Sequence, residues 1–147
     1  LAALELRLSA PDVSAAVAAL NGAQPLHGDT HAVHGAGFFL PGRGLAAVRE
    51  DVGRHNALDK LAGAVVRQDL NGADGAVVVT SRISVEMDQK TAILASPILI
   101  AISPPTAPAV RTAEEAGMTL VALARGEEFE VFTRPERIGR GAIADVA

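Results

Sequence analysis

The sequence predicts an α/β fold in which helices cover both faces of a mixed β-sheet, a three-layer α/β/α arrangement. Three short apolar runs rich in β-branched residues, 75–80, 97–102 and 118–124, are typical of buried sheet strands. Helix-like segments separate these runs, as in a sheet whose strands are joined by helical connections. The chain is 49% hydrophobic but only 3% aromatic, so small aliphatic side chains must form its core. We expect residues 1–147 to form one domain.

The first predicted elements are a helix and a β-hairpin. A helix over about 11–21 is indicated by Ser9, which can serve as its N-cap, and by Asn21-Gly22, which provide a stop signal. Two β-like runs follow. The sequence Pro41-Gly42-Arg43-Gly44 between them has the composition of a hairpin turn.

A longer amphipathic helix follows the hairpin. From Arg54 onward, apolar residues recur with the spacing of one helical face until Asn71-Gly72, and we place this helix at 54–69. Its predicted apolar face consists of Leu58, Leu61, Ala62, Val65 and Val66. Two more helices are expected at about 84–95 and 106–117, between the apolar strands, and a last strand at 128–133. The tail that begins at Arg134 shows no assignable pattern.

Composition excludes several function classes. The formal net charge of -4 argues against a broad nucleic-acid-binding surface. No apolar run is long enough for a membrane span, and the N-terminus lacks the order of a signal peptide, so we expect a cytoplasmic protein. The chain has no cysteine, which removes disulfides, Cys-based zinc sites and a thiol nucleophile from it.

Polar segments follow three of the predicted strands and open the next helices: residues 49–56, 80–84 and 103–108. In an open α/β sheet, ligands bind beyond the carboxyl ends of strands, next to helix N-termini whose free N–H groups favour anions. We therefore expect a set of basic and hydroxyl side chains to converge on a phosphate-like group. These are Arg54, Arg82, Ser81, Ser84, Ser103 and Thr106.

Each of these segments also has a simpler interpretation. A Ser or Thr at a strand-to-helix junction is most often only an N-cap, and Glu50 and Asp51 can favour the dipole of the helix that follows. The pairs Asp59–Lys60 and Glu86–Lys90 are explained as solvated helix pairs. Residues 124–130 have the composition of a solvated hairpin turn.

Three histidines, His27, His31 and His34, occur close together. On a strand, His27 and His31 would share one face while His34 would point to the other. A tetrahedral zinc site would also lack a fourth ligand. We therefore predict no metal site and favour a neutral, hydrogen-bonding pocket histidine.

The chain contains four long motifs in this order: EDVGRHNALDKLAG, SRISVEMDQK, SPPTAPAV and TLVALARGEEFEVFTRPERI. Together they strongly resemble the formate dehydrogenase accessory sulfurtransferase family, FdhD. The segment GDTHA, residues 28–32, resembles the Gly-x-x-His-Ala segment of that family, so His31 rather than His34 is the corresponding histidine. The resemblance covers residues 11–138.

The resemblance implies a fold similar to that of cytidine deaminases. It also implies a homodimer that takes persulfide sulfur from a cysteine desulfurase. The sulfur is then passed to molybdenum bis(molybdopterin guanine dinucleotide), the cofactor destined for formate dehydrogenase. A zinc deaminase activity is opposed by the missing His-x-Glu and Pro-Cys-x-x-Cys patterns.

The resemblance further implies which residues bind the cofactor. The guanine-dinucleotide binding stretch of the family corresponds to Leu123, Ala124, Arg125, Gly126, Glu127 and Glu128. Further candidates are His31, Arg54, Ser81 and Arg82, and a GDP-like nucleotide should mimic the cofactor. The two glutamates make this stretch more acidic than a pyrophosphate site requires, although a carboxylate can accept hydrogen bonds from a guanine edge.

The sulfur relay of the family depends on a Cys-x-x-Cys loop, because only a thiolate can attack a persulfide and carry its outer sulfur. This chain lacks that loop, and we assign it no catalytic residue. We expect a C-terminal fragment of a longer protein, because residue 1 is Leu rather than Met, in preference to a natural variant without sulfur transfer. The chain alone should bind the cofactor without transferring sulfur. The alternative is a non-catalytic guanine-nucleotide-binding or dimerisation module.

Overall fold

The computed structural model describes residues 6–23 and 34–139, and its elements follow the predicted order. The strands are β1 His34–Leu40, β2 Gly44–Asp51, β3 Ala76–Val79, β4 Ile98–Ala101, β5 Thr119–Arg125 and β6 Glu128–Thr133. The helices are α1 Ala10–Gly22, α3 Arg54–Arg67, α4 Val85–Ile93 and α5 Ala107–Glu115. Short 3-10 turns, η2 Gly72–Asp74 and η3 Pro135–Arg137, precede β3 and follow β6.

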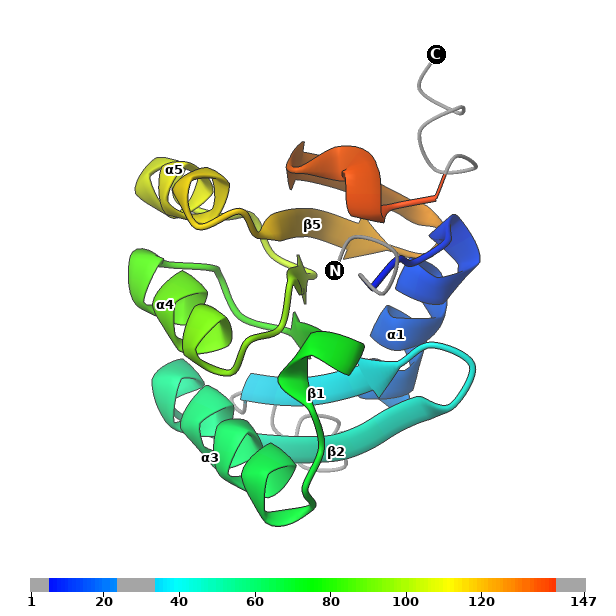
Figure 1. Ribbon diagram of the computed structural model, residues 1–147, viewed down its shortest axis with the longest axis vertical. Coiled ribbons are helices and arrows are strands. Elements are labelled where there is room, and N and C mark those ends of the chain that lie inside the picture. Colours follow the sequence, from blue (N-terminus) through cyan, green and yellow to red (C-terminus); the bar gives the residue numbers. More distant parts are fainter. Residues whose placement is uncertain (1–5, 24–33, 140–147) are drawn as a thin grey trace.

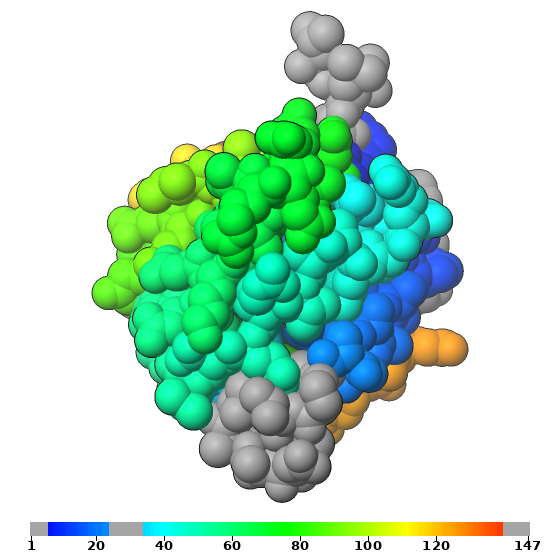
Figure 2. All heavy atoms as spheres, turned by 90° about the horizontal axis from the view of Figure 1, so that it is seen from below, coloured from blue at the N-terminus to red at the C-terminus, as the bar shows by residue number. Residues whose placement is uncertain are grey.

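The strands form one mixed sheet in the order β2-β1-β3-β4-β5-β6. β3, β4 and β5 are parallel, whereas β1 is antiparallel to both of its neighbours and β6 is antiparallel to β5. Helices α3, α4 and α5 cover one face and α1 covers the other (Figure 1). Seen from the β2 edge, the β1–β2 hairpin lies between α3 and α1 (Figure 2). The predicted three-layer α/β/α arrangement is confirmed.

An apolar core fills each of the two spaces between helices and sheet. Phe38, Met87 and Leu120 belong to the cluster beneath α3, α4 and α5, whereas Leu20 and Ile100 belong to the cluster beneath α1. All five side chains are fully buried. Since burial of apolar surface is the main favourable term in folding, the two cores hold the sheet rigidly between its helical layers.

The strand directions bring the functional segments to one edge of the sheet. β2, β3, β4 and β5 run in the same direction, so Asp51, Val79, Ala101 and Arg125 end along this edge. β1 and β6 run the other way and begin here, and His34 is paired with Asp51. We call this side of the molecule the carboxyl edge.

Helix α3 differs from the prediction in its end and in its buried face. It ends at Arg67 rather than at residue 69, because Asp69 adopts a left-handed backbone (φ 56) and Leu70 N donates to Val65 O at 3.0 Å. Val66 was predicted to be buried but is 69% exposed. The buried face instead consists of Ala57, Leu58, Leu61, Ala64 and Val65. Hydrophobic periodicity misassigned the buried face of α3 because alanines contribute little hydrophobicity, although they allow the helix to approach the sheet closely.

The segment that the sequence pattern left unassigned closes the sheet near α1. Ile138 forms a parallel bridge with Leu8, and Leu8 N donates to Arg137 O at 2.8 Å. Leu8 and Ile138 are both buried in the core beneath α1. Residues 134–139 therefore fix the N-terminal end of the described chain against the last strand.

Candidate functional site

The three predicted polar segments do lie together along the carboxyl edge, each where a strand ends and a helix begins. Asp51 leads into α3, residues 80–84 connect β3 to α4, and residues 102–106 connect β4 to α5. The last two connections are joined directly, because Ile83 bridges Pro105 and Thr106 N donates to Ile83 O at 3.0 Å. The edge is thus a continuous surface rather than three separate loops.

Two arginines at this edge have no partner among the described residues. Arg54 is the first residue of α3 and Arg82 lies three residues before α4, and both side chains are exposed. Within residues 6–23 and 34–139, no hydrogen bond or ion pair engages either guanidinium group. In the part of the chain that the structure describes, the N-cap residues of α3 and α4, Gly53 and Ser84, make no side-chain cap to the first N–H groups of these helices. Cations and free helix N–H groups in one place favour an anion.

The hydroxyl groups of this edge serve different purposes. Thr106 accepts from Ala109 N at 3.2 Å and is an N-cap, as in its simpler interpretation. Ser103 Oγ donates to Thr80 O at 2.9 Å, which ties the end of β4 to that of β3. Ser81 is buried, with 4% of its surface exposed, whereas Arg82 next to it points to solvent. Ser103 and Thr106 are thus engaged in structural hydrogen bonds of the described chain.

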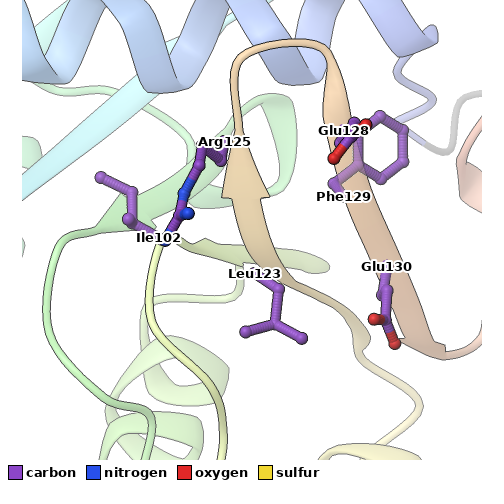
Figure 3. A pocket seen from close by; sticks show the side chains of 6 residues that line it. All are labelled: Ile102, Leu123, Arg125, Glu128, Phe129 and Glu130. Carbon is purple, nitrogen blue, oxygen red and sulfur yellow. The ribbon is translucent and has the colours of Figure 1, made fainter.

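A pocket of about 420 Å³ lies at the β5–β6 end of the carboxyl edge (Figure 3). Three predicted residues, Leu123, Arg125 and Glu128, line it. Three further lining residues were not predicted: Ile102, Phe129 and Glu130. The pocket thus combines one guanidinium group and two carboxylates with apolar walls.

The β5–β6 turn shapes this pocket. Arg125 is paired with Glu128, which leaves a two-residue turn whose first residue, Gly126, has a φ of 60. A positive φ at the first central position is typical of a type II′ hairpin turn, and the composition of residues 124–130 had indicated a hairpin turn here. Leu123 also has a positive φ, 56, within an irregularity of β5 between Ala122 and Arg125. Such a bulge adds one residue to the strand, and here it leaves Leu123 38% exposed at the pocket.

The side chains of the predicted cofactor-binding stretch do not all line this pocket. Ala124 is buried in the core beneath α1. Glu127 lines a second hollow of about 510 Å³ together with Ala10, Pro11, Ser14 and Ala15 of α1. The side chains of Ala124 and Glu127 therefore lie outside the pocket that Leu123, Arg125 and Glu128 line. His31 lies outside the described residues.

The other charged residues of the motif EDVGRHNALDKLAG, residues 50–63, have structural contacts. Lys60 Nζ lies 2.6 Å from Asp51 Oδ2, and Gly53 N donates to Asp51 Oδ1 at 2.9 Å. The hydrogen bond from Lys60, with that from Gly53, lowers the pKa of Asp51 below its ordinary value. Asp59 pairs with Lys90 of α4 at 2.7 Å rather than with its neighbour Lys60. These contacts hold the β2–α3 turn and α4 in place.

Residues 1–139 match the FdhD/NarQ family. The chain belongs to this family. It is 67% identical over 127 residues to the sulfur carrier protein FdhD of Agrobacterium fabrum, covering 86% of the chain and 47% of that protein. The sulfur carrier protein FdhD of Xanthomonas campestris is 45% identical over 136 residues, covering 92% of the chain and 48% of that protein.

A solved structure of the same family confirms the fold. The chain is similar to a protein from Desulfotalea psychrophila described as a formate dehydrogenase accessory protein, with a TM-score of 0.86 and 35% identity. The match covers 92% of this chain and 58% of that one. The chain therefore spans about half the length of the curated FdhD relatives it matches.

Sequence reasoning missed one buried polar residue of this FdhD/NarQ domain. Asp88 on α4 is 0% exposed, and neither carboxylate oxygen has a hydrogen-bond partner among residues 6–23 and 34–139. Burial raises the pKa of Asp88 to about 7. The only available signal was an acidic residue one turn after Ser84, which helical spacing places on the same face of the helix.

Two further findings concern the described residues as a set. No three His, Asp or Glu side chains among them gather as ligands for a metal ion. Within the same segments, no helix combines the length and apolar character needed to cross a membrane.

Proposed function

We propose that this chain is the cofactor-binding part of a sulfur carrier that serves formate dehydrogenase maturation. Its substrate is molybdenum bis(molybdopterin guanine dinucleotide), which is sulfurated while bound and then delivered to formate dehydrogenase. The family and the names of the curated relatives support the sulfur-carrier role. The arrangement of charges at the carboxyl edge supports cofactor binding.

The observation that carries this proposal is the pairing of two different chemistries along one edge. Arg54, Arg82 and the free N–H groups of α3 and α4 suit the pyrophosphate groups. The pocket at β5–β6 has two carboxylates, Glu128 and Glu130, beside apolar walls. Carboxylate oxygens can accept from the adjacent N1–H and N2–H groups of guanine, so this pocket suits the base.

The spacing along the edge suits one extended ligand. β3, which leads to Arg82, is separated from β5 by β4 alone. Neighbouring strands lie about 4.8 Å apart, so the two strand ends are about 10 Å from each other. A nucleoside diphosphate can bridge that distance with its base at one end and its phosphates at the other.

The sulfur itself must travel on a thiol that this chain does not contain. A cysteine persulfide, formed with a cysteine desulfurase, would present its outer sulfur atom to the bound cofactor. The chain's own part is to bind and orient the cofactor, and the thiol must come from outside these 147 residues. We propose a homodimer as the assembly in which this takes place.

Calorimetric titration tests the proposal. GDP serves as the first ligand and the purified molybdenum cofactor as the second. We expect both to bind, the cofactor more tightly because it offers two guanine dinucleotide arms. Absence of binding for both ligands would contradict the proposal.

The same titration addresses the alternative, a guanine-nucleotide-binding or dimerisation module without a role in sulfur transfer. Such a module would bind GDP and show no preference for the larger cofactor. A second measurement asks whether the chain alone restores formate dehydrogenase activity in cells that lack the accessory protein. We expect no activity, because the thiol is missing.

A further inference from the structure

Helix α4 carries buried polar atoms that the described chain leaves without partners. Both carboxylate oxygens of Asp88 and the hydroxyl oxygen of Ser84 are buried and form no hydrogen bond. Ser84 and Asp88 are four residues apart, so consecutive turns of the helix bring them to one face. Buried polar groups are nearly always hydrogen-bonded, because an unsatisfied one costs free energy. A cluster of three unsatisfied oxygens therefore needs a specific explanation.

The cluster faces the seam between α4 and α5. Lys90 follows Asp88 by two residues, or about 200° around the helix, and its Nζ reaches Asp59 of α3 at 2.7 Å. Asp88 consequently lies on the flank of α4 that is turned away from α3. α4 lies between α3 and α5 (Figure 1), and the buried residues of α5 are Ala109 and Ala113. The neighbours of Asp88 across the seam are thus small and apolar.

No charged group of the described chain compensates Asp88. The charged side chains of α3, α4 and α5 other than Asp88 are exposed or form ion pairs elsewhere: Arg54, Asp59, Lys60, Arg67, Glu86, Lys90, Arg111, Glu114 and Glu115. His55 of α3 is half-buried at the start of that helix. β3 and β4 beneath α4 are entirely apolar. Burial alone accounts for the raised pKa of Asp88.

The seam begins directly below the candidate site. α4 follows Ser81 and Arg82, α5 follows Ser103 and Thr106, and the backbone bond from Thr106 N to Ile83 O joins the two helix starts. A change in how α4 packs against α5 must therefore move the connections that carry Arg82. The buried cluster is coupled mechanically to the carboxyl edge.

We propose that the α4–α5 seam is a pH-sensitive switch in which the neutral Asp88 keeps α4 packed and the ionised Asp88 opens the seam to water. An ionised carboxylate without a partner cannot remain buried, so α4 must loosen or admit solvent to hydrate it. Loosening of α4 releases Arg82 and the first N–H groups of the helix from the geometry that favours an anion. The effect on ligand binding rests on the proposed function, whereas the opening of the seam does not.

Hydrogen–deuterium exchange of the whole chain at pH 6 and pH 8, corrected for intrinsic exchange rates, tests the opening. With a pKa of about 7, the ionised fraction of Asp88 is about tenfold larger at pH 8 than at pH 6. In the proposed switch, the population of the open state rises by the same factor. We expect the protection factors of the α4 amides to fall by that factor from pH 6 to pH 8 in the wild type. They should not change with pH in Asp88→Asn. Asp59→Asn is the matched control, since it removes an exposed carboxylate in the same helical layer and should keep the wild-type response. Equal α4 protection at the two pH values in the wild type, or a pH response retained in Asp88→Asn, would overturn the proposal.

GDP titration of the same proteins separates this inference from the proposed function. We expect GDP to bind the wild type more weakly at pH 8 than at pH 6, and to bind Asp88→Asn equally at both. If the wild type binds no GDP at either pH, the proposed function fails, and the exchange data alone decide the switch. If GDP binds the wild type and Asp88→Asn with the same pH dependence, the link between seam and site is wrong.

Discussion

Lys60 Nζ lies 2.6 Å from Asp51 Oδ2, so a residue on the second turn of α3 holds the last residue of β2. Asp51 also accepts from Gly53 N, which fixes the turn that precedes Arg54. The contacts of Asp51 with Lys60 and Gly53 form a structural clamp at the start of α3, and Arg54 follows directly after it. The polar residues at this helix start divide between folding and binding.

Substitution of Asp51 tests the clamp. Asp51→Ala removes two acceptors of a carboxylate whose side chain is 17% exposed, and we expect a larger loss in the free energy of unfolding than for a more exposed ion pair. Urea denaturation measures this loss. Asp59→Ala is the control, because its ion pair with Lys90 is more exposed and should contribute less than about 1 kcal/mol. Equal losses in the two variants would show that Asp51 is no more than a surface partner.

The two free arginines should bind phosphate. We expect Arg82→Ala to weaken GDP binding about tenfold, because a charge-assisted hydrogen bond to a phosphate contributes about 1.5 kcal/mol or more. Arg54→Ala should weaken it less, because β2, which leads to Arg54, is separated from β5 by three strands. Calorimetry at low and high salt measures the effect, and the salt dependence of affinity should decrease in both variants. Arg67→Ala, at the opposite end of α3, should leave GDP affinity unchanged. A loss in Arg67→Ala as large as in the other two would indicate a general charge effect.

Gly72 is required by close packing rather than by a turn. A Cβ at Gly72 would lie 1.8 Å from Leu94 O, a backbone atom that cannot move aside without displacing the end of α4. We expect Gly72→Ala to lower the free energy of unfolding by more than about 2 kcal/mol. Gly22→Ala meets no atom within 4 Å and should be neutral or slightly stabilising at the end of α1. A thermal melt that ranks the two variants in the reverse order would contradict the close approach.

Asp88 makes global stability depend on pH. Its pKa in the folded state, about 7, lies above the ordinary value of 3.8, so the folded chain binds more protons than the unfolded chain between these values. Stability therefore falls as the pH rises from about 4 to 7 and is constant above, as far as this group is concerned. Each pKa unit corresponds to about 1.4 kcal/mol, so the loss amounts to a few kcal/mol. Urea denaturation from pH 5 to 8 should show this fall in the wild type and a flatter profile in Asp88→Asn.

The order of elements was predictable because it depends on local signals. The capping box of α1, in which Ser9 and Asp12 accept each other's backbone N–H groups, is local in sequence. The same holds for Gly126, whose positive φ the β5–β6 turn requires. Hydrophobic periodicity added the rest of the α/β pattern, although it misjudged Val66 because the buried alanines of α3 carry so little signal.

The candidate site was predictable only in part. Strand order brings Arg54 and Arg82 to the same edge, as the rule for parallel strands indicates. The separation of Glu127 from Glu128 could not be predicted from two adjacent glutamates, because the bulge at Leu123 and the turn at Gly126 decide which hollow each side chain lines. Glu130 enters the pocket from β6 and Ile102 from the connection that follows β4.

By itself, the sequence determined the α/β class, the order of helices and strands, and the absence of any thiol for sulfur transfer. The tertiary structure alone decided which charges are paired. Lys60 pairs with Asp51 of β2 and Lys90 pairs with Asp59 of α3, rather than with the helical neighbours that the sequence spacing suggested. It also decided that Asp88 is buried without a partner. The physical reason is the same in both cases. Periodicity describes one element at a time, whereas burial and ion pairing depend on which distant element is packed against it.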